Sequence, residues 1–188
     1  MRKNNDILEI IKNRRSVRSY KNEIIKEDEL ERILEAARWA PSAINKQPWQ
    51  FIVIKDKNIL NQLGGQFFSK HLKEAAVVIV VLTDEPDNKW ATIDCSLASE
   101  NLMLEASSLG IGSCFVGSFK EKKLRNLLNI PNECKIIGLI TLGYPKEDQK
   151  APLKKDLKDI ISVNKYQKHK QNIFKSGIAS IIKEKLSV

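Results

Sequence analysis

Arg14-Arg15-Ser16-Val17-Arg18 concentrates three guanidinium groups and a hydroxyl in five residues. Arginine offers a planar fork of donors that matches the oxygens of a phosphate. A second stretch, Pro41-Ser42-Ala43-Ile44-Asn45-Lys46-Gln47-Pro48-Trp49, is a loop bracketed by prolines that carries the polar side chains of Ser42, Asn45 and Gln47. Their donors and acceptors suit the polar edge of a heterocycle. A pocket with a phosphate end and a ring-edge end indicates a nucleotide-like cofactor.

The size and composition around these stretches are those of a soluble globular protein. The chain has 188 residues, 42% hydrophobic and 29% charged, which fits one domain of ordinary size. Its longest apolar run, residues 75–82, is too short to cross a bilayer. No apolar segment follows the first six residues, so we expect no secretory signal and a cytoplasmic location.

The cysteines and the net charge argue against a metal site and against nucleic-acid binding. Cys95, Cys114 and Cys134 are odd in number and lack metal-type spacing, so we expect them to pack as small apolar residues and predict no metal site. The net charge of +9 comes mainly from lysines between Lys146 and Lys185. No nucleic-acid-binding module accompanies them, so a solvated face is favoured and no nucleic-acid partner is predicted.

Hydrophobic periodicity predicts helices alternating with strands. In residues 27–40, Leu30, Ile33, Leu34 and Ala37 form one apolar stripe that Pro41 terminates. A helix over 91–109 is apolar on several sides, so we expect it to be deeply buried, between subunits as one alternative. The other predicted helices cover residues 6–13, 58–63 and 120–128, and the predicted strands cover 49–55, 75–82, 112–116 and 135–144.

The pattern changes after residue 162, so we divide the chain into a domain of residues 1–162 and an extension of residues 163–188. In the extension, an apolar face stands among lysines, formed by Phe174, Ile178, Ile181, Ile182 and Leu186. Such an amphipathic helix docks on its own domain, on a partner subunit or on a membrane surface. We favour the partner subunit and predict no membrane partner.

The motifs, taken in order, resemble the nitroreductase family of flavin mononucleotide (FMN) oxidoreductases. The likeness covers about residues 5–161. It rests on the two stretches quoted above, on Ala98-Ser99-Glu100-Asn101-Leu102-Met103-Leu104-Glu105-Ala106, on Leu109-Gly110-Ile111-Gly112-Ser113-Cys114 and on Leu142-Gly143-Tyr144-Pro145. The resemblance implies an α+β fold with a mostly antiparallel central sheet flanked by helices. It also implies an intertwined homodimer with two flavin sites, each built from both chains.

Site residues follow from the same resemblance. Arg14, Arg15 and Ser16 match phosphate and ribityl contacts, and Arg18 matches a basic residue near the pyrimidine side of the ring. The backbone of Val116 and Gly117 matches the segment that faces flavin N5. The second subunit would contribute Pro41, Ser42, Ala43 and Asn45, with Gln47 nearby. The family's arginine after the Gly-Tyr-Pro turn is absent, which leaves Lys154 or Lys155 as its substitute, and Lys70-His71 is a looser candidate near the ring.

The implied activity is hydride transfer from NADH or NADPH, through FMN, to a nitroaromatic, a quinone or a similar electron-poor small molecule by a ping-pong mechanism. The coenzyme carries the redox chemistry, so no catalytic acid or base is assigned. Two alternatives stay open: a specialised relative that dehalogenates, dehydrogenates or fragments its flavin, and a flavin-binding protein for storage or sensing.

Each site residue also has a structural interpretation. The three arginines would form a solvated basic face, and Lys154 and Lys155 would be solvated lysines. Asn45 and Gln47 would satisfy a turn. We expect Trp49 in the core, and for Trp90 and His71 we favour packing and surface roles over roles in the site. The short link from Leu82 to Ala91 predicts an open pocket.

Overall fold

The computed structural model describes residues 6–64 and 70–168. The chain forms two compact units, Met1–Ala151 and Pro152–Val188. The first holds the sheet and its helices, and the described part of the second contains one short 3-10 helix, η2 (Leu157–Asp159). The apolar face predicted at residues 174–186 lies outside the described residues. The division at residue 162 and the docking of the extension on a partner therefore stay predictions.

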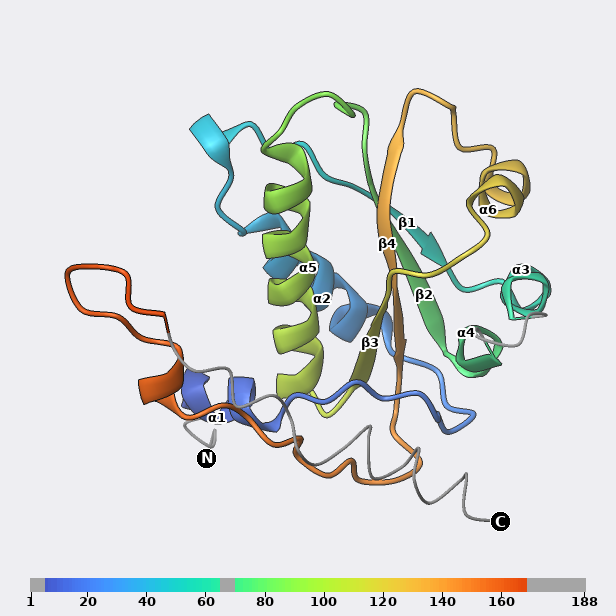
Figure 1. Ribbon diagram of the computed structural model, residues 1–188. Coiled ribbons are helices and arrows are strands. Elements are labelled where there is room, and N and C mark those ends of the chain that lie inside the picture. The colour runs from blue at the N-terminus through green and yellow to red at the C-terminus, as the bar shows by residue number, and fades with distance from the viewer. Residues whose placement is uncertain (1–5, 65–69, 169–188) are drawn as a thin grey trace, which may run out of the picture. The chain divides into compact units, whose positions relative to one another are not determined.

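The first unit is built on a four-stranded antiparallel sheet (Figure 1). Its spatial order is β1 (Gln50–Ile54), β2 (Val77–Thr83), β4 (Lys135–Gly143) and β3 (Gly112–Val116). Every neighbouring pair is antiparallel. The prediction of an α+β fold with a mostly antiparallel sheet is thus confirmed, and each predicted strand exists to within two residues at either end.

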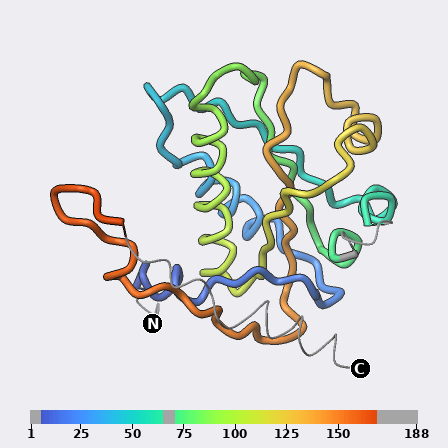
Figure 2. The backbone as a smooth tube through the Cα atoms, in the orientation of Figure 1, coloured from blue at the N-terminus to red at the C-terminus, as the bar shows by residue number. Residues whose placement is uncertain are grey.

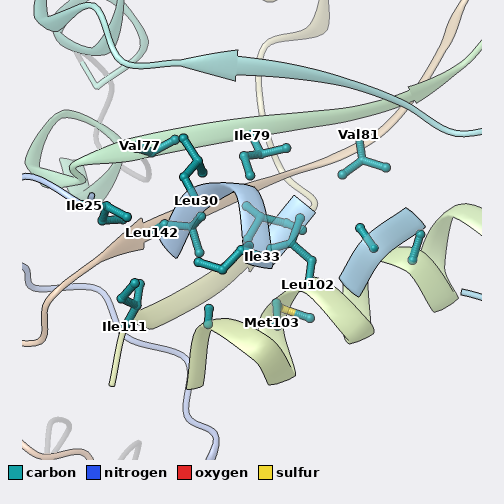
Figure 3. Close-up of a cluster of buried hydrophobic side chains, with 14 of the residues drawn as sticks. Ile25, Leu30, Ile33, Val77, Ile79, Val81, Leu102, Met103, Ile111 and Leu142 are labelled. Carbon is teal, nitrogen blue, oxygen red and sulfur yellow. The ribbon is translucent and has the colours of Figure 1, made fainter. Parts of the chain in front are cut away.

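Helices α2 (Glu27–Arg38) and α5 (Ala91–Ser108) cover one face of the sheet, as Figure 1 shows. Successive side chains of a strand point to opposite faces, and on β2 the residues Val77, Ile79 and Val81 point to this face. Figure 3 shows them meeting Leu30 and Ile33 of α2 and Leu102 of α5. All of these side chains are buried.

The opposite face packs against three shorter helices, α3 (Lys57–Leu63), α4 (Lys70–Glu74) and α6 (Glu121–Leu128). The alternate residues of β2 form the centre of this second cluster. Since both faces are covered, all seven residues of β2 are buried, which explains its uninterrupted apolar run.

Local signals in the sequence set the bounds of α2. Three acidic residues occupy its first turn, where they complement the helix dipole, and the backbone N–H of Lys26 donates to Glu29 Oε2 at 3.1 Å. Its predicted apolar stripe is the buried stripe. The predicted helix ended at Ala40, whereas α2 ends two residues earlier, at Arg38. Ala40 precedes Pro41, and helical backbone angles are disfavoured for a residue before proline.

Helices α5 and α4 differ from what the sequence predicts. Helix α5 is buried on one face only: Ala98 and Leu102 are inaccessible, whereas Ile93 and Leu97 are exposed on the single chain. Helix α4 had no sequence prediction, because it is a single short turn whose one buried apolar side chain is Leu72. The three cysteines are buried and free, as predicted.

The part of the chain that the structure describes contains no helix long and apolar enough to span a membrane. Over the same ranges, no group of three or more His, Cys, Asp or Glu side chains is placed to hold a metal ion.

Ile33→Ala should lower the free energy of unfolding by about 2–5 kcal/mol, because the Ile33 side chain is fully buried and its truncation leaves a cavity beneath α2. Urea denaturation followed by circular dichroism measures the loss. Ile24→Ala is the matched control: Ile24 is 89% exposed, so its truncation should change stability by less than about 0.5 kcal/mol. Equal losses in the two variants would contradict the assigned core.

Candidate cofactor site

The segment that carries the three arginines is held against the outer edge of β3. It follows α1 (Ile7–Asn13), and Ser16 forms a parallel bridge with Ser113, in which the Val17 N–H donates to the Ser113 carbonyl at 2.9 Å. A Cβ at Gly112 would lie 2.7 Å from a Val17 methyl carbon, so this close approach requires glycine. The segment is therefore fixed by the backbone of the sheet.

Arg14 lies in a partly enclosed position between α1 and α5. Its Nε is 3.4 Å from Glu100 Oε1, close enough for an ion pair but without the geometry of a hydrogen bond. Among the described residues this Nε has no hydrogen-bond partner, although it is shielded from solvent. An enclosed guanidinium nitrogen without an acceptor is suited to an anionic ligand.

Arg15 is partly committed to its own helix. One terminal nitrogen, Nη1, donates to the carbonyl oxygens of Lys12 at 2.7 Å and Arg14 at 2.6 Å, at the C-terminal end of α1. A cation at this end also complements the helix dipole. Its Nε is enclosed and, within the described ranges, unpartnered. Arg15 thus stabilises the segment, and only part of its guanidinium is left for a ligand.

Arg18 is exposed and lies beside β3 and α4. Burial raises the pKa of the Cys114 thiol, and the charges of Arg18 and Arg14 oppose that rise. Burial also lowers the pKa of His71, and Arg18 lowers it further. The Nε2 atom of His71 is enclosed without a partner in the described part of the chain. The structure therefore brings Arg18 and His71 together with the strand that leads into Val116 and Gly117.

A cavity of about 370 Å³ adjoins Arg14 and Arg15. Its other walls are the turn after α5 and the loop after β4, which contributes Glu147 and Asp148. Ser113 also lines it, and this serine is 1% exposed with a hydroxyl that has no hydrogen-bond partner among residues 6–64 and 70–168. Glu147 and Asp148 are exposed, whereas Arg14 and Arg15 are partly buried, so the cavity wall carries both signs of charge and the arginine side of the cavity has the charge for a phosphate.

The loop of residues 41–47 has an unusual backbone. Ile44, Asn45 and Gln47 have φ values of 50°, 58° and 53°. For a β-branched residue such as Ile44 this region costs roughly 1–2 kcal/mol. The Gln47 N–H donates to Ser42 Oγ at 3.0 Å, and the Gln47 side chain donates to the Asn45 carbonyl at 3.2 Å. Gln47 therefore satisfies the turn, as its structural interpretation anticipated, while the Asn45 carboxamide stays exposed.

Two ties attach this loop to the rest of the unit. The Ala43 N–H lies 3.2 Å from Asp94 Oδ2 and 3.4 Å from Oδ1, in the first turn of α5. Lys46 forms an ion pair of 2.7 Å with Glu85, and this contact, with an Asn88 hydrogen bond, lowers the pKa of Glu85. The loop thus rests on the N-terminal end of α5 (Figure 2).

One chain does not bring the two predicted halves of the site together. Arg14 and Arg15 share a cavity with Ser107, at the C-terminal end of α5, whereas the loop is bonded to Asp94. The helical rise from Asp94 is about 9 Å to Glu100, which faces Arg14, and about 20 Å to Ser107. Figure 2 shows the loop and α1 near opposite ends of this helix. A contribution of the two halves by different subunits fits this separation.

The remaining candidates are Lys154 and Lys155 of the second unit and two tryptophans, Trp49 and Trp90, of the first. Lys154 and Lys155 are exposed residues of the second unit, in irregular chain just after Pro152. Trp49 packs partly buried against the first core cluster, as expected. Trp90 is 47% exposed, and the Lys89 ammonium lies 5.0 Å from the centre of its ring.

Sequence reasoning missed three residues of the site: Asp94, Glu100 and Ser113. Glu100 was quoted within a motif but had no role, and Ser113 looked like an ordinary strand residue. The sequence did contain an indication for Asp94, because a carboxylate in a helix that is expected to be buried needs a hydrogen-bond donor or a cation. Its 4% exposure shows that it needs a partner inside the fold.

The family model described as "Nitroreductase family" matches residues 11–70 and 64–144 of this chain. A protein of Archaeoglobus fulgidus with the provisional name NADH dehydrogenase/NAD(P)H nitroreductase is 40% identical over 154 residues, which cover 77% of this chain and 88% of that protein. An FMN-dependent nitroreductase from Clostridium difficile superposes with a TM-score of 0.75 at 31% identity, covering 84% of this chain and 98% of that structure. A Thermus thermophilus NADH dehydrogenase is 29% identical over 173 residues, 72% of this chain and 84% of that protein.

Gly112→Ala should displace the arginine segment from β3, because the new Cβ would meet three Val17 carbons at 2.7–3.0 Å. We expect a loss of about 1–3 kcal/mol in the free energy of unfolding and faster hydrogen exchange at the Val17 amide. Gly117→Ala is the control, since its Cβ would meet nothing nearer than a Phe115 ring carbon at 3.8 Å. Unchanged Val17 exchange in Gly112→Ala would contradict the close packing described here.

Proposed function

Because the chain belongs to the nitroreductase family, we propose that it is an FMN-dependent oxidoreductase that takes hydride from NADH or NADPH and reduces nitroaromatic, quinone or similar electron-poor acceptors. The names of the relatives support NAD(P)H-dependent oxidoreduction, and one structural neighbour is named as FMN-dependent. The observation that carries the proposal is a pair of enclosed guanidinium nitrogens, Nε of Arg14 and Nε of Arg15, which have no hydrogen-bond partner among the described residues and lie in the same segment as an exposed Arg18.

The donor set fits FMN at both of its ends. Arg14, the free part of Arg15 and Ser16 would hold the phosphate and ribityl chain, with Lys154 or Lys155 as an additional cation. Arg18 would lie near the pyrimidine side of the ring, and the backbone of Val116 and Gly117 near N5. The loop of residues 41–47 of a second subunit, through Pro41, Ser42, Ala43, Asn45 and Gln47, would complete the site. The Gln47 side chain donates within its own loop, whereas the Ser42 hydroxyl only accepts there and the Asn45 carboxamide is exposed, so we expect Ser42 and Asn45 to be the stronger polar contacts of that set.

When bound, FMN supplies the hydride-accepting and electron-donating chemistry that no side chain provides. The contribution of the protein is binding, orientation and charge. A guanidinium at Arg18 would stabilise negative charge on a ring bound beside it and would so raise the reduction potential of the coenzyme. The nucleotide and the acceptor would occupy the same open face in turn, which gives ping-pong kinetics without a catalytic acid or base from the chain.

A homodimer follows from the same proposal. The single chain exposes a set of apolar side chains on α1 and α5: Ile7, Leu8, Ile11, Ile93 and Leu97. Exposed apolar side chains on two helices of the same chain are consistent with a subunit interface. The outer edge of β1 is also open, since in the described part of the chain only β2 pairs with it, and a groove of about 850 Å³ runs between this strand and α2.

We propose that residues 163–188 pack on the partner subunit. The cytoplasmic location and the lack of nucleic-acid and membrane partners stay predictions.

Arg14→Ala should weaken FMN binding about ten- to hundredfold, because it removes a charge-assisted contact to the phosphate. The flavin content of the purified protein and an equilibrium titration of the apoprotein with FMN measure the effect. Arg32→Ala is the matched control, because Arg32 is an exposed arginine that pairs with Glu105 on the surface. Wild-type FMN occupancy in Arg14→Ala would show that the phosphate assignment is wrong.

The activity itself is tested by anaerobic titration of the purified yellow protein. NADH or NADPH should bleach the flavin absorbance, and a nitroaromatic or quinone added afterwards should restore it without nucleotide present. Bleaching by neither nucleotide would favour a storage or sensing protein or a different electron donor. Protein that neither carries nor takes up flavin would contradict the proposed function.

A further inference from the structure

Asp94 is a buried carboxylate that the proposed chemistry does not use. It is 4% exposed and lies in the first turn of α5, where the helix dipole favours a negative charge. In the described ranges the Ala43 N–H is its one hydrogen-bond donor, and no cation forms an ion pair with it. A buried carboxylate with a single protein donor depends strongly on that donor.

The donor belongs to a loop that cannot hold its own shape by packing. Three of its residues have positive φ values, and the side chain at its tip, Ile44, is 93% exposed and contributes no buried contact. Strained backbone of this kind persists where its surroundings fix it. The tie to Asp94 is the less exposed of the two, because its carboxylate is buried and its donor is partly buried, whereas the Lys46–Glu85 pair is more exposed and screened by water.

We refer to the hydrogen bond between the Ala43 N–H and the Asp94 carboxylate as the latch, because it ties the loop to α5. If the loop moved away from α5, the carboxylate would lose its hydrogen bond while remaining inside the protein. Ser42 immediately precedes Ala43, and its hydroxyl accepts from the Gln47 N–H while keeping its own proton for a ligand. Asn45 follows two positions later with an exposed carboxamide. The latch thus sets where both polar groups are presented.

We propose that Asp94 is a positioning residue that fixes the loop of residues 41–47 and, through Ser42 and Asn45, orients the ring end of the flavin bound by the partner subunit. The inference rests on the proposed function for its second half only. The latch itself is a property of the chain without cofactor, so the two halves have separate measurements.

Hydrogen exchange of the full-length apoprotein tests the latch. Asp94→Ala should raise the exchange rate of the Ala43 amide by about tenfold or more, because its acceptor is gone. Asp94→Asn keeps an acceptor oxygen and should restore most of the protection. Asp94→Leu fills the same space without an acceptor and covers the case in which the alanine variant does not fold. Protected amides of β2 report that the core is intact. Glu85→Gln removes the charge from the partly exposed pair with Lys46 and should change Ala43 exchange by less than about threefold.

The same variants loaded with FMN test the second half. Asp94→Ala and Asp94→Leu should shift the visible flavin spectrum and the midpoint potential, and Asp94→Asn should resemble the wild type. Unchanged Ala43 exchange in both acceptor-free variants would overturn the latch. Faster exchange with a wild-type spectrum and potential would overturn the orienting role. If wild-type protein binds no FMN, the proposed function fails, yet the exchange of Ala43 still decides the latch.

Discussion

The hydrogen bond from the Val17 N–H to the Ser113 carbonyl is the contact on which the candidate site depends. It adds a short strand-like segment to the edge of β3 and thereby fixes the backbone between Arg14 and Arg18. The Tyr20 hydroxyl strengthens this attachment through bonds to the Val17 carbonyl and to Thr141 Oγ1 on β4. Burial raises the pKa of Tyr20, so this hydroxyl keeps its proton well into alkaline solution. A charged segment that would be mobile on a surface is held here by the sheet.

Helix α5 is the common support of both halves of the site. It carries one carboxylate for each half: Glu100 faces Arg14, and Asp94 holds the backbone of the 41–47 loop. Its buried face packs on the sheet through small and aliphatic side chains such as Ala98 and Leu102, which fixes the helix and hence both carboxylates. The apolar residues Ile93 and Leu97 on its exposed face are left for a second subunit in our proposal. One helix therefore relates the cofactor-binding groups to the proposed interface.

Periodicity and terminal signals in the sequence were sufficient for most of the fold. Strand β3 was predicted with its observed bounds because glycine ends the preceding helix, and α2 was predicted because its apolar stripe has helical spacing. Short-range patterns could not reveal α4, which is too short to show a period. They also could not reveal the bond between Ala43 and Asp94, which are 51 positions apart. The use of Arg15 to cap its own helix is a matter of rotamer and local geometry, which residue type alone does not determine.

The separation along α5 of the two proposed cofactor-binding halves has a thermodynamic consequence. If each coenzyme is held by groups from two chains, coenzyme binding and subunit association are linked equilibria, and each one strengthens the other. The apparent affinity for FMN then rises with the concentration of the protein itself. Dilution below the dissociation constant of the pair would then release the coenzyme, so a cell that makes little of this protein would hold it mainly in the colourless form.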